Sequence, residues 1–168
     1  SNVSLTSKAQ GYVQVSGNKA ASLSNVDVKG GNAARIESAE GMLSANHLNV
    51  ESERQILVVA KDKATLNNAE FKTTLVDAGI DVDNMGIQVE SLEQAVAVTN
   101  LVSTSDVTQL MAKTDISLNS AAVEGDLAAY AETGDASVAG TVKVSGGTTV
   151  NAEQGAANLS GSISVEED

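Results

Sequence analysis

Apolar side chains recur in pairs two residues apart, and these pairs return along the chain at a regular interval. Their starting positions are separated by 22, 21, 52, 21 and 21 residues. The pairs are Val26/Val28, Leu48/Val50, Ala69/Phe71, Ala121/Val123, Val142/Val144 and Ile163/Val165. Residues two apart share one face of an extended strand, whereas a helix needs a spacing of three or four. The pattern therefore predicts an internal repeat of strands with a period near 21 residues.

Each repeat contains two further pairs, so a repeat holds three short strands. After Leu48/Val50 come Ile56/Val58 and Ala64/Leu66. The same frame opens the chain, with Val3/Leu5, Val13/Val15 and Ala21/Leu23. Such a unit cannot bury its apolar side alone, so successive units must stack around a continuous core. We expect one domain over residues 1–168, an all-β, right-handed parallel β-helix (a solenoid) of roughly eight to nine coils.

The stretch 72–120 is less regular than the rest. Ile87/Val89 fits the start of a coil and Val107 fits another, which gives coils of unequal length. The segment 91–101 also has apolar residues at helical spacing, so a short helical excursion is an alternative there.

Asparagine, serine or glycine closes the third strand of several repeats. Asn and Gly tolerate the positive φ that a tight corner needs. We therefore predict one row of corner residues, stacked about 4.8 Å apart. Its members are Asn25, His47 or Asn46, Asn68, Ser120 and Gly161.

Small polar residues occupy the outward positions of the third strands. They are Ser22, Ser44, Thr65, Ser117, Ser137 and Asn158. This pattern predicts a flat face. Such a face suits lateral packing of filaments, a flat partner, a flanking segment folded back on it, or plain solvation.

Composition narrows the function classes. The chain has three aromatic residues, Tyr12, Phe71 and Tyr130, which argues against a deep ligand pocket. It has no cysteine, which excludes disulfides, zinc–thiolate sites and thiol nucleophiles, and it has no proline, as expected where most amides join ladders. No stretch is long and apolar enough for a membrane span. With one histidine, His47, at a predicted corner, a Ser-His-Asp arrangement has little support.

Charge divides the chain into two halves. Residues 1–72 carry eight basic and seven acidic side chains, whereas residues 73–168 carry two basic and fifteen acidic ones. A strongly negative half opposes nucleic-acid binding, which needs clustered Lys and Arg. It fits either the solubility of a secreted protein or the binding of divalent cations.

Carboxylates are the abundant chemically active groups. Asp77, Asp81 and Asp83 are candidate calcium ligands, because Asp81 and Asp83 share one strand face. Paired carboxylates also serve as acid and base in glycoside cleavage. We expect no catalytic residues and no cofactor apart from Ca²⁺ at these carboxylates. A second acidic cluster, Glu124, Asp126, Glu132 and Asp135, is expected to be a solvated edge.

The segment 48–71, LNVESERQILVVAKDKATLNNAEF, resembles the repeats of filamentous haemagglutinin-like exoproteins of two-partner secretion. These repeats alternate apolar strands with an Ala/Gly-Lys/Arg-Asp turn, which here is Ala60-Lys61-Asp62, and a Thr-Leu-x-Asn/Gly-Ala strand. Echoes at 21–30 and 116–125 extend the similarity over about half of the chain. The resemblance implies a secreted filament on a bacterial surface, used for adhesion or for presenting a tip domain, with no catalytic residues in the shaft.

We therefore expect a non-catalytic shaft or adhesion module, cut from a longer repetitive protein, and not an enzyme. Its partners would be a protein or glycan on a host or neighbouring cell, or adjacent coils of the same protein. One alternative is the trimeric β-prism spike of phage and type VI secretion devices, and another is a polysaccharide-active β-helix enzyme. Because uncapped β-helix ends present unpaired strands, self-association through the end coils is also expected.

Overall fold

A computed structural model describes residues 3–7, 11–74 and 86–166, and the described part is built from fourteen strands with no helix. The strands are β1 Val3–Thr6, β2 Tyr12–Gly17, β3 Ala20–Lys29, β4 Ala33–Ser38, β5 Met42–Ser52, β6 Gln55–Ala60, β7 Ala64–Thr73, β8 Gly86–Ser91, β9 Val96–Ala112, β10 Ile116–Ala131, β11 Ala136–Val144, β12 Thr148–Ala152, β13 Ala157–Leu159 and β14 Ser162–Val165.

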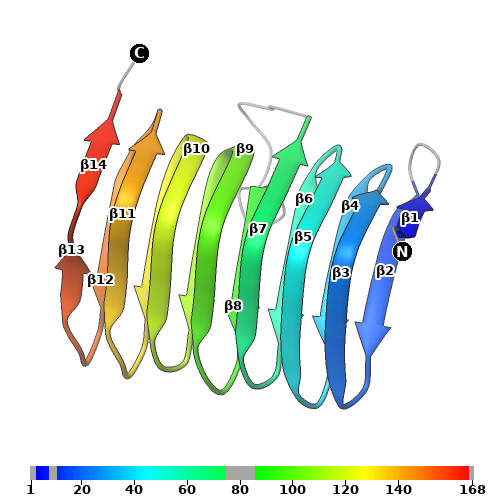
Figure 1. The fold of residues 1–168 in the computed structure, drawn as a ribbon, viewed down its shortest axis with the longest axis horizontal. Coiled ribbons are helices and arrows are strands. Elements are labelled where there is room, and N and C mark those ends of the chain that lie inside the picture. Colours follow the sequence, from blue (N-terminus) through cyan, green and yellow to red (C-terminus); the bar gives the residue numbers. More distant parts are fainter. Residues whose placement is uncertain (1–2, 8–10, 75–85, 167–168) are drawn as a thin grey trace.

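Every paired strand lies parallel to its partner, and the chain winds as a single coil (Figure 1). In that view β3, β5 and β7 run upward on the near side and β4, β6 and β8 run downward behind them, while the chain advances from right to left. This winding is right-handed. The structure thus confirms the predicted right-handed parallel β-helix.

The registers confirm the repeat that the apolar pairs predicted. Along the first-strand row, each residue is the Cα partner of the one in the next coil. The row reads Val3, Val26, Leu48, Ala69, Leu101, Ala121, Val142 and Ile163. These eight positions mark about seven turns, fewer than the predicted eight to nine.

The lower count arises because Ala69 is the Cα partner of Leu101, so these two positions, 32 residues apart, are one step along the row. Ile87 pairs with Ile56, so it belongs to the second-strand row and does not start a coil. Val107 pairs with Asp126, also in the second-strand row, so the second proposed coil start is wrong for the same reason. The helical alternative over 91–101 is wrong as well, since a turn there leads directly into β9.

In β3, β5, β7 and β11 a third strand continues around its corner into the first strand of the next coil, whereas β9 and β10 also include the second strand, and β13 and β14 are separate strands. The long strands, such as β3 and β5, bend where a residue adopts positive φ. The bends are Asn25 (51°), His47 (54°), Asn68 (54°), Asn100 (56°), Ser120 (64°), Gly140 (79°) and Gly161 (94°). The predicted corner row is confirmed, with His47 and not Asn46 in the second coil.

Val, Leu, Ile and Ala fill the core, together with one aromatic ring. Phe71 is 1% exposed and lies in a register row between Val50 and Ser103. The small side chain of Ser103 in the next coil leaves room for the ring. Interior hydroxyls bond to one another nearby, with Thr73 Oγ1 donating to Ser105 Oγ (2.9 Å) and Thr108 Oγ1 to Ser103 Oγ (3.0 Å). These four hydroxyl groups are thereby satisfied inside the stack, whereas among the described residues Ser38 Oγ and Thr148 Oγ1 are buried with no hydrogen-bond partner.

Candidate functional site

The three carboxylates predicted as calcium ligands, Asp77, Asp81 and Asp83, lie outside the described residues. Among residues 3–7, 11–74 and 86–166, no group of three or more His, Asp or Glu side chains is placed to hold a metal ion. His47 occupies the corner of the second coil with an exposed side chain, as the sequence predicted for a corner residue.

The second acidic cluster is divided between two places in the coil, with Glu124 and Asp126 on either side of Gly125 and with Glu132 and Asp135 in the turn between β10 and β11. Asp126 Oδ1 accepts a hydrogen bond from the amide of Gly147 (2.7 Å), and Asp135 Oδ1 accepts one from Ala156 (2.8 Å). Asp115 does the same for the amide of Asp135 (2.9 Å). Part of the acidic excess therefore caps turn amides of the following coil, a role that sequence spacing alone did not reveal.

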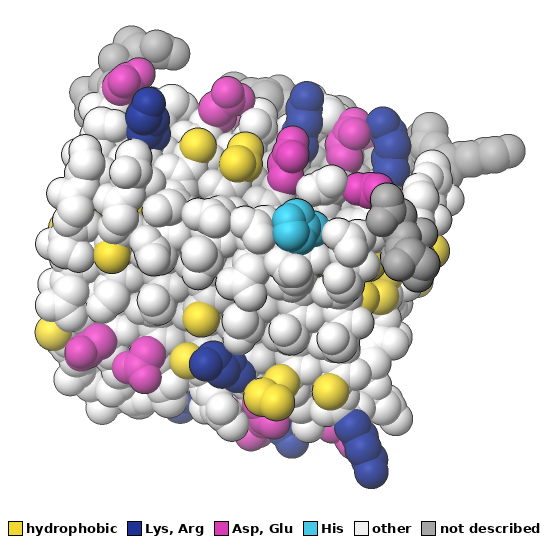
Figure 2. Space-filling view, viewed as in Figure 1, with side chains coloured by type: hydrophobic (Ala, Val, Ile, Leu, Met, Phe, Trp, Pro, Cys, Tyr) yellow, Lys and Arg dark blue, Asp and Glu magenta, His cyan; other side chains and the backbone are white. Residues whose placement is uncertain are grey.

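The outward positions of the third strands carry short side chains. Register pairs connect the predicted residues in one unbroken row, into which the structure inserts Ala97 between Thr65 and Ser117. The row is Ser22, Ser44, Thr65, Ala97, Ser117, Ser137 and Asn158. In Figure 2 the central band of the molecule is mostly uncharged, with charged side chains above and below it. We call the row from Ser22 to Asn158 the small-residue face.

Side-chain amides extend the order of this face along the axis. Asn68 Nδ2 donates to Asn46 Oδ1 (3.3 Å), and Asn100 Nδ2 donates to Asn68 Oδ1 (3.0 Å). These bonds join three successive coils at the corner. Asn68 and Asn100 therefore adopt the positive φ of the corner and also hydrogen-bond to the preceding coil through their side chains.

The first-strand face differs, because it is charged at its N-terminal end. Lys29 Nζ lies 3.1 Å from Glu51 Oε2, and Asn49 Nδ2 donates to Asp27 Oδ1 at 2.8 Å. A shallow, open groove runs between these side chains. The outward row that contains Asp27 and Asn49 continues along the stack to Val102, an apolar residue that is 48% exposed. Surface pairs of this kind each contribute about 0–1 kcal/mol, so the charged end is a solvated surface more than a source of stability.

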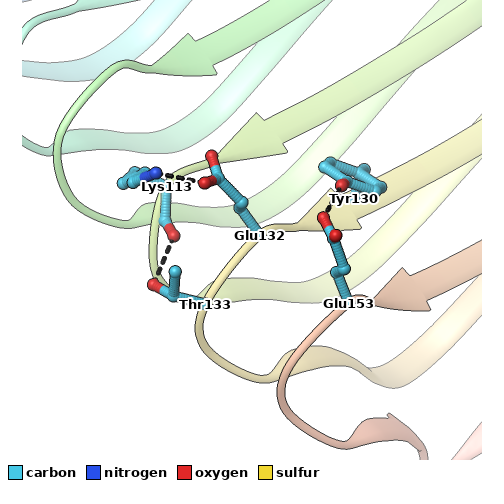
Figure 3. Close-up of polar contacts among 5 residues, drawn as sticks. All are labelled: Lys113, Tyr130, Glu132, Thr133 and Glu153. Atoms are coloured by element: carbon cyan, nitrogen blue, oxygen red, sulfur yellow. Dashed lines mark hydrogen bonds and ion pairs between the residues drawn. The ribbon is translucent and has the colours of Figure 1, made fainter.

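Charged contacts also join coils at the turn between second and third strands (Figure 3). Lys113 pairs with Glu132 of the next coil, and Thr133 Oγ1 donates to the Lys113 carbonyl (2.7 Å). One coil further, the Tyr130 hydroxyl donates to Glu153. This hydrogen bond raises the pKa of the Tyr130 hydroxyl, and desolvation and the charges of Glu153 and Glu132 act in the same direction.

The raised pKa of Tyr130 leads to a titration experiment. The protonated hydroxyl is the bonded form, so its contribution is complete below the ordinary tyrosine pKa of about 10 and is lost as pH rises through the higher folded value. In a Tyr12→Phe background Tyr130 is the single tyrosine, and its tyrosinate absorbance should have a midpoint above pH 10. Adding Glu153→Gln should lower that midpoint, whereas adding Glu124→Gln should not. An unchanged midpoint in the Glu153→Gln chain would contradict the assigned contact.

Comparison with protein-family models, with curated proteins and with solved structures finds no match. The described residues contain no helix with the length and hydropathy to cross a membrane.

Proposed function

We propose that this chain is a non-catalytic structural shaft, with an adhesion role, in a secreted bacterial surface protein. The observation that carries the proposal is the unbroken first-strand row, which runs from Val3 to Ile163 without a change of pairing direction. Parallel ladders between coils resist bending and extension because each coil is hydrogen-bonded to both neighbours. At about 4.8 Å per coil, about seven turns span about 34 Å.

The small-residue face supports the adhesion part of the proposal. Every coil of this row except the one with Ala97 presents a short hydroxyl or amide group, so an extended protein or glycan on a host or neighbouring cell would meet similar groups at nearly every step. The resemblance of the segment 48–71 to haemagglutinin-like repeats supports the same role and the secreted location. The proposal assigns no catalytic role to any residue.

A shaft must hold its ends at a fixed separation, and a pair of spin labels measures this. The chain has no cysteine, so Asp27→Cys and Lys143→Cys introduce two unique labelling sites. Both positions are exposed and lie in one outward row, five coil steps apart, or about 24 Å. In chain diluted with excess unlabelled protein, pulsed dipolar spectroscopy should give one narrow distance distribution. A broad distribution would rule out a rigid shaft.

A coil duplication provides the matched control. Ala122 pairs with Lys143, so a second copy of residues 122–142 adds one coil in phase. The label distance should then increase by about 4.8 Å with no broadening. Light scattering on the same samples addresses the trimeric spike, because a stable trimer that does not grow with concentration would favour that alternative over the shaft.

A further inference from the structure

The first-strand face has an apolar interruption in its middle coils. Its outward row passes from coil to coil through Cα partners whose side chains are exposed, apart from the half-buried Ser164 at the end. The row reads Asp27, Asn49, Glu70, Val102, Ala122, Lys143 and Ser164. Figure 2 shows hydrophobic side chains interrupting the charged band in the upper part of the molecule. Val102 and Ala122 therefore form an apolar step with polar and charged residues on both sides.

A shallow, open hollow lies over the same middle coils. Its lining includes Leu101, Val102, Ala121, Ala122 and Lys143. Val102 is exposed here, although the neighbouring core residues Leu101 and Ala121 are buried. Apolar surface with a polar rim is typical of contacts between proteins. Because the hollow is open, another protein surface would cover it more fully than a small molecule would.

The charged residues on either side of the apolar step have opposite signs. Glu70 lies one coil before Val102, and Lys143 lies one coil after Ala122. Neither takes part in the ion pairs found among the described residues. Within one chain, three coil steps, or about 14 Å, separate Glu70 from Lys143. Lys143 is also one of two basic residues in 73–168, a region with fifteen acidic ones. The row thus offers an acid and a base that another molecule can pair.

This order of groups is complementary to its own reverse. A second copy can pack on the face with its coils in the opposite order, related by a two-fold axis that is parallel to the strands. When the axis passes between the coils of Val102 and Ala122, Val102 faces Ala122 of the other copy and Glu70 faces Lys143. Each contact then occurs twice. Strand directions are unchanged by this rotation, so the two faces pack as aligned sheets about 10 Å apart.

Neighbouring registers are less favourable. A shift by one coil in one direction places Glu70 against Ala122 of the other copy. A shift by one coil in the other direction places Lys143 against Val102. In both cases a charge without a partner loses water against an apolar side chain, which costs free energy. The opposite charges therefore select one register.

Charge also selects the antiparallel order of the two copies. In a parallel pair Glu70 would meet Glu70, and the acidic part of the chain, 73–168, would meet its own copy. The antiparallel order instead places that part against residues 1–72, which carry eight basic and seven acidic side chains. Antiparallel packing therefore brings together parts of different charge.

A second outward row on the same face fits the same register. Along the strand it lies two residues beyond the first, and it includes Glu51, Lys72, Thr104 and Glu124 as successive Cα partners. In the antiparallel pair Glu51 faces Glu166 of the other copy, and Thr104 faces Glu124. Lys72 then lies one coil step from both Glu166 and Glu124 of the other copy. The like charges at this rim are thus separated by a lysine.

We propose that two copies of this chain pack side by side with antiparallel coil axes, burying Val102 and Ala122 between their first-strand faces and pairing Glu70 of each copy with Lys143 of the other. This goes beyond the shaft proposal, because a shaft can act as a single chain. The contact spans six coils, about 29 Å, and about 17 Å along the strands, so each copy buries about 500 Å². An interface of this size is at the small end for specific contacts, so the dimer should dissociate on dilution.

Sedimentation velocity over a range of concentrations tests the pairing. The mean mass of the wild-type chain should rise with concentration and level off at the mass of two chains, and added salt should weaken the association. Glu70→Lys should weaken it by about tenfold or more, because two pairs of like charges then face each other. Glu40→Lys is the matched control, since Glu40 is exposed in the turn between β4 and β5 and undergoes the same change of charge. It should leave the association unchanged.

A charge exchange tests which residues meet. Lys143→Glu alone should weaken the association as Glu70→Lys does. An equimolar mixture of the two variants should form dimers again, because both contacts of a mixed pair join opposite charges. The double variant Glu70→Lys/Lys143→Glu should dimerise for the same reason. Circular dichroism checks that each variant keeps the fold.

Four results would overturn the antiparallel dimer. They are a wild-type chain that stays monomeric at millimolar concentration, a mass that grows beyond two chains, equal effects of Glu70→Lys and Glu40→Lys, and a mixture of the two variants that stays monomeric. The spin-label distance within one chain is the same in a monomer and in a dimer. The shaft and the dimer can therefore fail independently.

Discussion

Replacing Phe71 with alanine is expected to lower the free energy of unfolding by about 3–5 kcal/mol. The ring is 1% exposed in the middle of the stack and lies between Val50 and Ser103 in its row. Its neighbour Ser103 is too small to fill the space that the ring would vacate, so a cavity should remain. Urea denaturation followed by far-ultraviolet circular dichroism measures the loss.

The control for Phe71 is an outward side chain in the same region. Val102 follows the corner of the next coil and is 48% exposed, so Val102→Ala should change stability by no more than about 0.5 kcal/mol. If Phe71→Ala and Val102→Ala proved equally mild, the core assignment of the Phe71 row would be wrong.

Gly125→Ala should be the second large effect, with a loss of about 2–4 kcal/mol. Gly125 has φ of +106°, a conformation that residues with a side chain rarely adopt. A Cβ at this position would also overlap the backbone carbonyl oxygen of Ser105 in the preceding coil. Because that oxygen belongs to the stacked backbone, relief requires the two coils to separate locally. Thermal unfolding followed by circular dichroism should show a clear decrease in midpoint.

Gly147 is the matched control for Gly125, since it lies in the next coil at the same corner region. The nearest atom to a Cβ there is Asp126 Oδ1 at 3.5 Å, an ordinary contact. Gly147→Ala should therefore leave the unfolding midpoint nearly unchanged. Equal losses at both glycines would show that flexibility of the turn, and not the close approach of coils, governs stability there.

The strand rows of the regular coils were predictable because alternation and period act together. Ser22, Ser44 and Thr65 stack as expected, since a shift by one residue would turn every apolar side chain outward. The corner row was predictable for a different reason, because few residues other than Asn and Gly adopt positive φ at low cost. The absence of proline agrees with the same ladder.

The segment from Gly86 to Ala112 was not predictable in the same way. An alternating pair such as Ile87/Val89 looks the same in a first strand as in a second strand, so its row depends on the length of the preceding segment. The step from Ala69 to Leu101 is 32 residues, so the period no longer identifies the row. Only pairing with Ile56 shows where Ile87 belongs.

The acidic residues show most clearly the difference between what the sequence reveals and what the stacking of coils reveals. The charge difference between the halves of the chain follows from the sequence and needs no coordinates. Whether a given carboxylate repels its neighbours or caps a turn depends on which residue lies one coil away. Asp126 and Asp135 cap amides 21 residues further along the chain, a distance that only stacking makes short.

The sequence by itself determined the class of fold, the corner residues and the small-residue face, because alternation, period and positive-φ tolerance are local properties repeated in each coil. The tertiary structure decided the number of turns, the row to which Ile87 and Val107 belong, and the partners of Asp126, Asp135 and Glu153. These depend on hydrogen bonds and packing between coils, which are set by the path of the chain around the axis and not by any single repeat.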